Sequence, residues 1–398
     1  MIEITSLDHN GRGIGRLNNK IVFVENALPK EIVEINITNE KKNFLEANVK
    51  SFIKKSDIRI ESRCPFFLNC GGCDLLHLNY ENSLDFKQDK IENIVNRYLK
   101  KNIKINKIIK CDNSFYYRNK TTFHVKEKIG FYKNKTYDII PIDNCLISSK
   151  SINNCIKYLQ MLELKLITKI TCRSSENELM IIIETISNNI DISPLKKIAN
   201  SIYIKNNNNY KLIYGQKYIT EKIGNYKYLV SPDSFFQVNI NTCFKLYSKI
   251  KEYVGTNNNV LDLYCGTGSI SIFVSKNNNV LGIEINKYAI KDAKENAKLN
   301  SIKNINFICG ESGKELENIK FNPDVVIVDP PRSGLSKDTI KNILKINTNK
   351  LIYVSCDPMT FVRDLSMLNE KYEIVEITPF DMFPNTKHVE CLCLLTLK

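Results

Sequence analysis

One cysteine in the C-terminal half of the sequence occupies a position from which it could act as a nucleophile. The apolar run 351–355 is typical of a buried strand, and Cys356 follows it directly in the sequence Ser-Cys-Asp-Pro. If that strand belongs to a parallel sheet, its carboxyl end faces the crevice in which such sheets bind ligands. A thiolate there could bond covalently to a substrate and divide a difficult reaction into easier steps. The alternative role for Cys356 is a small apolar residue packed in the core.

Two acidic residues lie beside other apolar runs. Asp329 ends the run 324–329 and precedes two prolines, which fix a rigid turn at the strand end. Methyltransferases that act on exocyclic amines carry an aromatic residue after such an Asp-Pro-Pro sequence, so Arg332 at this position argues against amine methylation. Glu390 stands at the start of the last apolar run, in the sequence His-Val-Glu. A lone glutamate at such a position is usually a solvated strand end.

A glycine turn after an earlier apolar run could hold a nucleotide-type cofactor. The run 260–264 leads into Gly-Thr-Gly starting at Gly266, and glycines let the backbone turn tightly and approach a ligand. Glu284 ends the next run, where an acid can accept both ribose hydroxyl protons. The dinucleotide fingerprint requires a third glycine where this chain has Ser271. Asp262 lies upstream of the glycines, as in S-adenosylmethionine (SAM) methyltransferases, and this resemblance favours SAM over NAD. The alternative is a plain strand–helix turn.

Several of the thirteen cysteines are clustered. Cys64, Cys70 and Cys73 have the spacing C-x5-C-x2-C, and Cys145 follows further along the chain. In a reducing compartment such a cluster indicates a metal site or catalysis rather than disulfides. Four thiolates fit tetrahedral zinc or a [4Fe–4S] cluster, and the spacing does not decide between them.

Composition restricts the class of protein. The chain has 57 Lys and Arg against 43 Asp and Glu, a net charge of +14, which favours a polyanionic partner unless it reflects compositional bias. No apolar run approaches the roughly 18 residues of a membrane span. The first residues lack the basic and apolar regions of a signal peptide. We therefore expect a cytoplasmic protein without membrane association.

Three parts are expected to position these residues. Residues 1–55 read as short alternating strands with glycine turns, typical of a small OB-like barrel. Residues 56–235 contain the cysteine cluster, a helix near 80–100 and several strands, which indicates a mixed α+β domain. From residue 236 to 398, apolar runs alternate with helical patterns, so we expect an α/β domain with a doubly wound parallel sheet.

In combination, Asp-Pro-Pro-Arg from Asp329, Ser-Cys-Asp-Pro around Cys356 and His-Val-Glu ending at Glu390 closely resemble the RNA uracil-5-methyltransferase family. The resemblance covers nearly the whole chain and includes Ser-Phe-Phe-Gln-Val-Asn at 234–239. It implies a Rossmann-like SAM domain at 236–398. The residues that it implies as SAM contacts are Gln237, Tyr264, Gly266, Ser269, Glu284, Glu311 and Asp329.

The family's chemistry explains this set of residues. C5 of uracil is a poor carbon nucleophile, and its proton is not acidic. The resemblance implies that Cys356 adds to C6, which turns C4–C5 into an enolate able to attack the methyl group of SAM. It also implies that Glu390 is the general base that removes the C5 proton, so that the cysteine can be eliminated. A base inside an RNA stem-loop must be extruded to reach such a site.

The resemblance also implies a [4Fe–4S] cluster on Cys64, Cys70, Cys73 and Cys145, with zinc as the alternative metal. The family's ribosomal-RNA members carry this cluster, and its transfer-RNA members generally lack it. Methyl transfer to an enolate needs no electron, so we expect a cluster that is structural or recognises RNA.

The N-terminal part resembles the TRAM domain, an OB-like RNA-binding barrel, through Gly11-x-Gly13-Ile-Gly15 and the residues that follow. Lys30 stands where glycine is usual, which should affect a turn more than a function. In the central part, Arg118 and Lys120 could contact phosphate, or they could form a basic strand edge.

The TRAM-like part and the cluster together favour 23S ribosomal RNA, or a large-subunit assembly intermediate, over transfer RNA. The alternatives are a transfer-RNA uracil-5-methyltransferase, an iron–sulfur redox protein and a non-catalytic RNA-binding assembly factor. No protein partner is expected.

Overall fold

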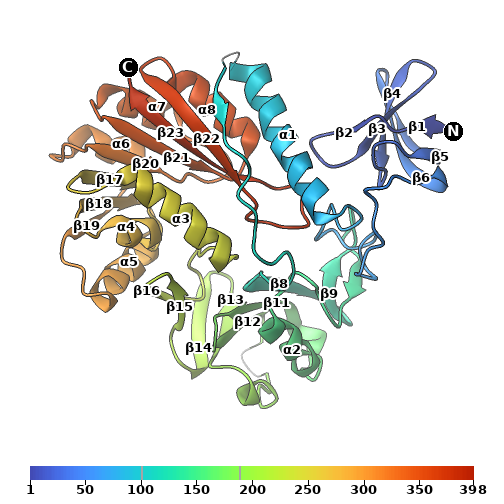
Figure 1. Ribbon diagram of the computed structural model, residues 1–398. Helices are drawn as coiled ribbons and strands as arrows, with labels where there is room; N and C mark the ends of the chain where they lie inside the picture. Colours follow the sequence, from blue (N-terminus) through green and yellow to red (C-terminus); the bar gives the residue numbers. More distant parts are fainter. Residues whose placement is uncertain (100–101, 188–189) are drawn as a thin grey trace. The chain divides into compact units, whose positions relative to one another are not determined.

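The chain forms two compact units, whose elements are labelled in Figure 1. The computed structural model describes residues 1–99, 102–187 and 190–398. Unit 1 comprises residues 1–90, 131–140 and 383–388, and unit 2 comprises residues 91–130, 141–382 and 389–398. Each unit is thus assembled from segments that lie far apart in the sequence. The expected division into three consecutive domains stays a prediction.

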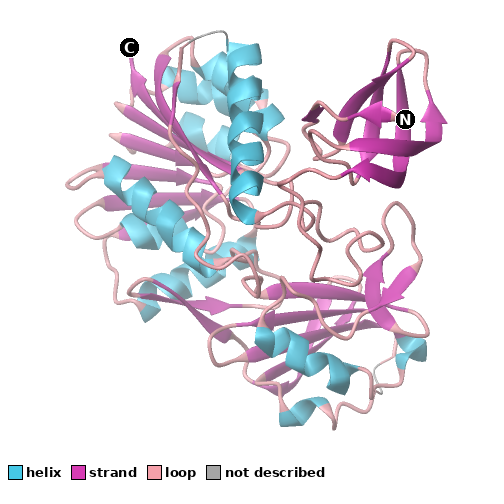
Figure 2. Cartoon of the chain, turned by 45° about the vertical axis from the view of Figure 1, so that its right-hand side comes forward, coloured by secondary structure: helices cyan, strands magenta, loops and turns pink. Residues whose placement is uncertain are grey.

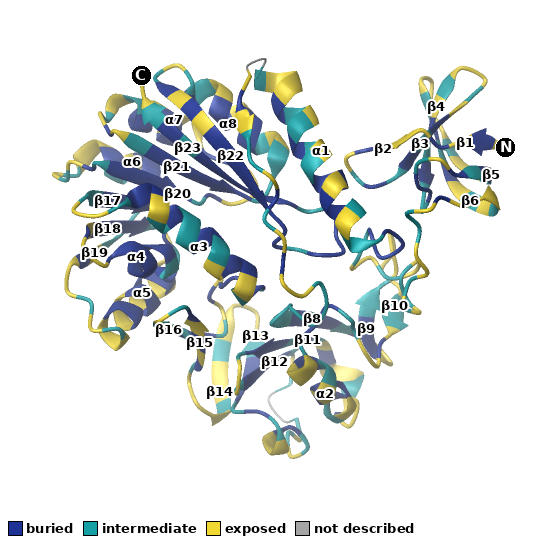
Figure 3. Ribbon diagram, in the orientation of Figure 1, coloured by how far each residue is buried: buried dark blue, intermediate teal, exposed yellow. Residues whose placement is uncertain are grey.

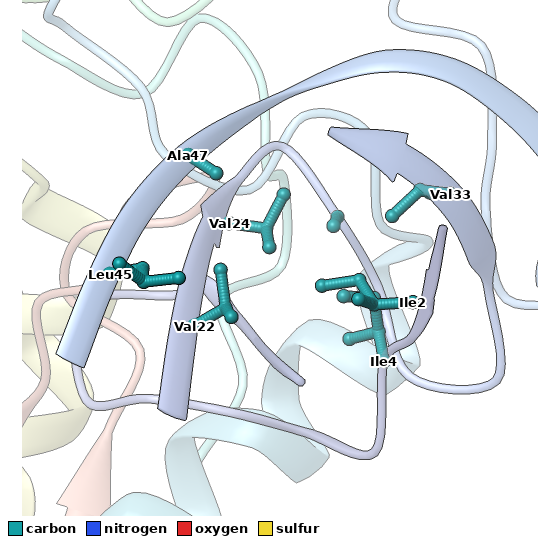
Figure 4. Close-up of a cluster of buried hydrophobic side chains, with 8 residues drawn as sticks. Ile2, Ile4, Val22, Val24, Val33, Leu45 and Ala47 are labelled. Carbon is teal, nitrogen blue, oxygen red and sulfur yellow. The ribbon is translucent and has the colours of Figure 1, made fainter. Parts of the chain in front are cut away.

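Unit 1 begins with a curved six-stranded sheet, and its strands alternate as predicted. They are β1 (Ile2–Glu3), β2 (Ser6–Leu7), β3 (Gly13–Leu17), β4 (Lys20–Glu25), β5 (Ile32–Glu40) and β6 (Phe44–Lys54). They pair in the order β1-β5-β6-β4-β3-β2, and the Thr5 amide donates to the Ile14 carbonyl (2.8 Å), which joins the first segment to β3. Figure 4 shows the side chains that fill the core: Ile2, Ile4, Val22, Val24, Val33, Leu45 and Ala47.

Two backbone positions in this sheet have special requirements. A Cβ at Gly13 would lie 2.8 Å from the Ile4 side chain and 2.9 Å from that of Ala27, so only glycine fits there. Lys30 has a φ of 68°, in the left-handed region that favours glycine. For other residues this conformation costs about 1–2 kcal/mol. The unusual lysine therefore sits at a turn, as the sequence predicts.

A buried ion pair connects the six-stranded sheet to the loop that follows it. Glu31 is fully buried, and its carboxylate accepts hydrogen bonds from the guanidinium of Arg59 (2.8 Å) and from the amide of Leu28 (2.8 Å). Arg59 also donates to the Asn26 carbonyl (2.8 Å) and lies over the ring of Phe52, 4.6 Å from its centroid. Removing one partner of a buried pair leaves an uncompensated charge, so these contacts hold the loop in place.

Unit 2 contains an antiparallel-rich central sheet. Its strands are β8 (Lys120–Val125), β9 (Ile129–Tyr132), β11 (Ile167–Ser174), β12 (Leu179–Thr185), β13 (Ser201–Asn206) and β14 (Asn209–Gly215). Together with β10 (Ile139–Pro141) they form a seven-stranded sheet in the order β10-β9-β8-β11-β12-β13-β14, in which only β12 and β13 are parallel among the pairs between β8 and β14; residues 131–140 at the β10 edge are counted with unit 1. The other elements of this region are α2 (Lys150–Leu159), η1 (Leu164–Leu166), η2 (Leu195–Lys197), β15 (Ile219–Ile223) and β16 (Tyr226–Val230). Helix α1 (Tyr80–Leu99) agrees with the predicted helix near 80–100.

The second sheet of unit 2 is the C-terminal α/β layer, and Figure 2 distinguishes its strands and helices by colour. Its strands are β7 (Lys104–Ile105), β17 (Asn259–Leu263), β18 (Asn279–Glu284), β19 (Ile305–Cys309), β20 (Val325–Val328), β21 (Lys350–Ser355), β22 (Tyr372–Phe380) and β23 (Glu390–Leu397). Its helices are α3 (Ile240–Val254), α4 (Ser269–Val274), α5 (Lys287–Leu299), α6 (Ser312–Asn318), α7 (Lys337–Lys345) and α8 (Pro358–Leu368). The strand order is β19-β18-β17-β20-β21-β23-β22-β7.

The predicted wholly parallel sheet is wrong at one strand. β17, β18, β19, β20 and β21 are parallel, but β23 runs antiparallel to both β21 and β22. The apolar run of β23 looks the same in either direction, so the sequence pattern could not show its orientation. The inner strands are buried along their length, as Figure 3 shows in dark blue, because helices cover this sheet. None of the described helices has the length and apolar character that a membrane span requires.

Candidate active site

The strand order of the C-terminal sheet brings the predicted site residues to one edge. β18, β17, β20 and β21 are parallel neighbours, so their carboxyl ends lie side by side. Glu284 ends β18, and the glycine turn follows β17. Asp329 and Cys356 follow β20 and β21 respectively. Within the antiparallel pair, Ser355 lies opposite Cys391, and one further step of this register places Glu390 beside Cys356.

The glycine turn has an unusual backbone. Tyr264, Gly266 and Gly268 have φ angles of 62°, 55° and 75°. A Cβ on Gly268 would lie 2.9 Å from the ring of Phe307, so this glycine permits close packing. A Cβ on Gly266 would meet nothing within 4 Å, so this glycine faces open space. The turn therefore presents bare backbone to a ligand at Gly266 and packs against the protein at Gly268.

One carboxylate is fixed at this turn, and a second lies buried on the strand before it. Glu284 accepts hydrogen bonds from the amides of Gly266 (3.2 Å) and Asn286 (2.8 Å), which fix it at the mouth of the turn. Asp262 is fully buried and accepts a hydrogen bond from Ser271, the residue that replaces the third glycine of the dinucleotide fingerprint. Its other oxygen, Oδ1, has no hydrogen-bond partner in the described part of the chain. Burial raises the pKa of Asp262 to about 7.

These features fit SAM, which has a ribose and a cationic amino-acid end. The open face of Gly266, the fixed carboxylate of Glu284 and the unpartnered oxygen of Asp262 supply a cradle, a ribose acceptor and a buried acceptor. No phosphate-binding third glycine is needed, since SAM carries no phosphate.

The remaining predicted SAM contacts differ in what holds them. Gln237 is buried, and its backbone carbonyl accepts a hydrogen bond from the Asn119 side chain (3.2 Å). Tyr264 bonds Thr339 of α7 through its hydroxyl (3.2 Å), and Ser269 bonds Tyr247 of α3 (2.8 Å). Glu311 precedes α6 and pairs with Lys314 (2.8 Å). All four stay predictions, and protein partners already occupy the side chains of Ser269 and Glu311.

The predicted nucleophile and base lie in a desolvated, acidic environment. Glu390 is fully buried, and burial together with the charge of Asp329 raises its pKa well above the usual range. Burial and the charge of Asp262 raise the pKa of Asp329 to about 7. Burial and the charge of Glu390 raise the pKa of the Cys356 thiol to about 11. In the free protein at neutral pH, Cys356 is therefore mainly a thiol.

Arg332 opposes these shifts, and the sequence argument did not assign it a part in catalysis. Its positive charge lowers the pKa of both Cys356 and Glu390. The loop that carries Arg332 is tied to α8, the helix that starts just after Cys356. Thr360 donates to the Arg332 carbonyl (3.0 Å), and Asp364 accepts from the amide of Leu335 (2.7 Å). The only signal in the sequence was an arginine directly after two prolines.

A basic segment is joined to the Gln237 segment in unit 2. The Asn119 amide donates to the Val238 carbonyl (2.9 Å), and Asn119 lies between Arg118 and Lys120. Burial and the charges of Arg173 and Arg118 lower the pKa of Lys120 to about 8. Crowded, partly desolvated cations favour an anion, so this geometry is compatible with the predicted phosphate contacts.

The four predicted cluster cysteines are distributed over both units. Cys64, Cys70 and Cys73 lie on a loop of turns in unit 1, and Cys145 lies in unit 2. Among the residues that the structure describes, no group of three or more His, Cys, Asp or Glu side chains is placed to hold a metal ion. Four thiolates have suitable chemistry for iron–sulfur or zinc. The metal centre is thus not confirmed, and no reaction step is assigned to it.

Comparisons with known proteins cover the whole chain. A family model described as tRNA (Uracil-5-)-methyltransferase matches residues 79–398, and one described as TRAM domain matches residues 1–50. Uncharacterized RNA methyltransferases of Clostridium acetobutylicum and Caldanaerobacter subterraneus are 35% and 36% identical over 99% of the chain and 96% and 97% of their own lengths. The crystal structure of Pyrococcus abyssi tRNA (uracil-54, C5)-methyltransferase in complex with S-adenosyl-L-homocysteine is 28% identical, with a TM-score of 0.82 and 100% of both chains covered.

We predict that Arg332→Gln slows alkylation of Cys356 by iodoacetamide. Loss of the positive charge raises the pKa of the thiol further, and each unit lowers its thiolate fraction about tenfold at neutral pH. In both proteins the rate should rise with pH up to the pKa of the thiol, because only the thiolate reacts. Peptide mass spectrometry separates Cys356 from the other cysteines.

Exposed Cys309 serves as the internal control, since its rate should not change. Arg332→Lys keeps the charge and should lie between wild type and Arg332→Gln. Equal rates at Cys356 in all three proteins would show that Arg332 does not act on the thiol.

Proposed function

Because the chain belongs to the RNA uracil-5-methyltransferase family, we propose that it methylates C5 of a uridine in 23S ribosomal RNA, or in a large-subunit assembly intermediate. It is an RNA methyltransferase with a SAM-dependent fold and a TRAM domain, so the redox and non-catalytic alternatives are set aside. The observation that carries the proposal is the meeting of Cys356, Glu390 and Asp329 beside the glycine turn at one sheet edge.

The proposed reaction proceeds through a covalent bond to the protein. Sγ of Cys356 bonds to C6 of uracil, and the C5–C6 electrons move towards O4 as an enolate. SAM bound at the glycine turn would supply an electrophilic methyl group; C5 would bond to that methyl carbon as its bond to sulfur breaks, and S-adenosyl-L-homocysteine would leave. Glu390 then accepts the C5 proton, the C5–C6 double bond re-forms, and the bond between C6 and Sγ breaks to return the thiolate.

The protonation states set a requirement for the first step. The thiol of Cys356, with its raised pKa, must lose a proton before attack, and Arg332 favours that loss. Glu390 must be ionised before it can accept the C5 proton, and burial together with the charge of Asp329 raises its pKa. Groups this close titrate as a set, so a positive charge brought to the site shifts all of them towards their ionised forms.

Binding of both substrates is assigned to separate groups. Gly266, Glu284 and Asp262 would hold SAM at the turn, with Gln237 and Tyr264 beside them. Arg118 and Lys120 would hold RNA phosphates. Asp329 would orient either the cofactor or the edge of the extruded base.

Transfer RNA is the second candidate substrate. The solved structure that covers the whole chain is of a tRNA (uracil-54, C5)-methyltransferase, and this observation favours transfer RNA. The cysteine spacing of C-x5-C-x2-C with the TRAM domain favours ribosomal RNA, through the resemblance to the family's ribosomal-RNA members.

We predict that the purified protein transfers labelled methyl groups from SAM to 23S ribosomal RNA and yields 5-methyluridine. Unmodified transfer RNA transcripts should remain unlabelled under the same conditions. Nucleoside mass spectrometry identifies the product and its RNA. Labelling of transfer RNA alone would support the second candidate, and a product methylated elsewhere than C5 would overturn the proposal.

We predict that substrate RNA containing 5-fluorouridine forms a stable adduct with the protein when SAM is present. Fluorine at C5 cannot leave as a proton, so the final elimination is blocked after methyl transfer. The adduct is measured as a shifted band in denaturing gels and mapped to Cys356 by mass spectrometry. An undiminished adduct in Cys356→Ala would contradict the assignment of the nucleophile.

Glu390→Gln is the complementary variant, because it retains size and burial but cannot accept the C5 proton. With ordinary uridine it should accumulate a methylated adduct at Cys356. Normal turnover in this variant would show that another group is the base.

The resemblance to the family's ribosomal-RNA members supports a [4Fe–4S] cluster on Cys64, Cys70, Cys73 and Cys145 in the protein as made in the cell, with zinc as the alternative. A loop of turns can close around a metal during assembly, since such ligands acquire their geometry from the ion they bind. In this proposal the cluster has a structural or RNA-recognising part, because the reaction moves no net electron.

We predict that anaerobically purified protein contains about four irons per chain, the content of one such cluster. Cys70→Ser should lose most of this iron, whereas Cys309→Ser, an exposed cysteine outside the set, should keep it. Elemental analysis measures both. Stoichiometric zinc without iron would identify the site as a zinc site instead.

A further inference from the structure

A buried histidine in unit 1 lacks hydrogen bonds on both ring nitrogens. His77 is 3% exposed, and neither Nδ1 nor Nε2 has a hydrogen-bond partner in the described part of the chain. Its ring stacks on Phe67, with the centroids 5.3 Å apart and an angle of 30° between the planes. A buried polar group without a partner costs about 1–3 kcal/mol. Such a group in a folded protein calls for an explanation, and an absent ligand is one.

A second unpartnered polar atom lies at the same place. Oδ1 of Asn26 is buried and also lacks a partner among the described residues. Asn26 has a φ of 60°, and Arg59 fixes its carbonyl with a hydrogen bond of 2.8 Å. Asn26 and His77 both line the same two cavities.

The first cavity, which we call the His77 pocket, has a volume of about 490 Å³. Its lining is confined to unit 1, between β6 and the cysteine loop. Phe52, Ile60, Phe67 and Leu68 give it apolar walls. Leu68 is 63% exposed, so the pocket is bordered by apolar surface that the fold leaves in water. A volume of this size lies in the range of about 300–1,000 Å³ that small ligands occupy.

The polar groups of the pocket select a neutral, flat ligand. Burial and the charge of Arg59 lower the pKa of His77 to about 3, so the ring is neutral at physiological pH. A neutral imidazole offers one N–H donor and one acceptor, and Asn26 adds a carbonyl acceptor. The guanidinium of Arg59 is already neutralised by Glu31, which leaves Lys55 and Glu61 as the other charged residues on the lining.

A nucleobase has this combination of apolar faces and a hydrogen-bonding edge. Proteins that bind single-stranded RNA stack bases on aromatic rings and place cations along the backbone. Phe52 and Phe67 provide rings, and Lys55 lies 5.7 Å from the centroid of the Phe52 ring, at the border of the pocket. We propose that the His77 pocket binds one unpaired base of the substrate RNA, other than the uridine that is methylated. This proposal rests on RNA as the substrate in the proposed function.

The test uses the stem-loop RNA that wild-type protein methylates, labelled with a fluorophore for binding by anisotropy. His77→Phe keeps the ring and its stacking on Phe67 but removes both nitrogens. We expect a thermal midpoint equal to or above that of wild type, because no unpartnered polar group stays buried. We expect RNA affinity to fall about 5- to 30-fold, the range of one lost base contact.

Two rim variants have matched neighbours outside the pocket. Leu68→Ala should weaken binding, whereas Ile53→Ala, also an exposed apolar residue, should not. Lys55→Gln should reduce the slope of log RNA affinity against log salt concentration by about 1. Lys54→Gln, its neighbour outside the pocket, should change RNA affinity by the same factor whichever base the RNA carries. Full-length protein is used throughout.

Abasic substitutions identify the base. One abasic position away from the methylated uridine should weaken binding to wild type but cause no further loss with His77→Phe. If RNA affinity is unchanged in both His77→Phe and Leu68→Ala, the pocket does not bind a base. Methyl transfer by the wild-type protein would in that case still support the proposed function. Failure of wild type to bind or methylate any RNA would instead contradict the proposed function.

Discussion

Four parallel strands of unit 2 end at the same edge of one sheet, and the candidate active site depends on that alignment. Glu284, the glycine turn, Asp329 and Cys356 each follow a different strand, and together they span a long stretch of sequence. Parallel hydrogen bonding aligns their carboxyl ends without any direct contact between the side chains. β23 adds what a purely parallel sheet could not. β23 runs antiparallel beside β21, and Ser355, the last residue of β21, lies opposite Cys391. The next step of this register places Glu390, the first residue of β23, beside Cys356.

Burial then determines how these groups behave. Asp262, Asp329 and Glu390 are shielded from water in one region, and loss of hydration disfavours each charged form. Burial and the charge of Glu390 raise the pKa of Cys356 to about 11, which keeps it a thiol in the free protein at neutral pH. A half-buried thiol with a raised pKa reacts slowly with oxidants and stray electrophiles. Thr360 holds Arg332 to α8. The positive charge of Arg332 lowers the pKa of the thiol and so favours the thiolate when a further positive charge is brought to the site.

The sequence allowed the strand ends to be predicted, because continuous apolar runs bounded by Gly, Asp-Pro-Pro and Cys-Asp-Pro have few other interpretations. It could not give the direction of β23, since an apolar run carries no polarity. It also could not show that Glu390 is buried, because a glutamate at a strand end is usually in water. Arg332 escaped assignment since its effect on Cys356 depends on hydrogen bonds from Thr360 and Arg363 to its loop. The grouping of segments 131–140 and 383–388 with the N-terminal barrel follows from contacts across hundreds of residues, which no local pattern records.

Both units contain buried polar atoms that lack a hydrogen-bond partner among the described residues. Most buried polar groups in this protein have partners, as the carboxylate of Glu31 does through Arg59 and Leu28. Oδ1 of Asp262 lacks one beside the turn where SAM would bind, and Nε of Arg173 lacks one near Lys120, where RNA phosphates would bind. His77 lacks partners on both nitrogens in unit 1. A buried polar atom without a hydrogen bond costs free energy, and a ligand of matching polarity at any of these three places would recover part of it.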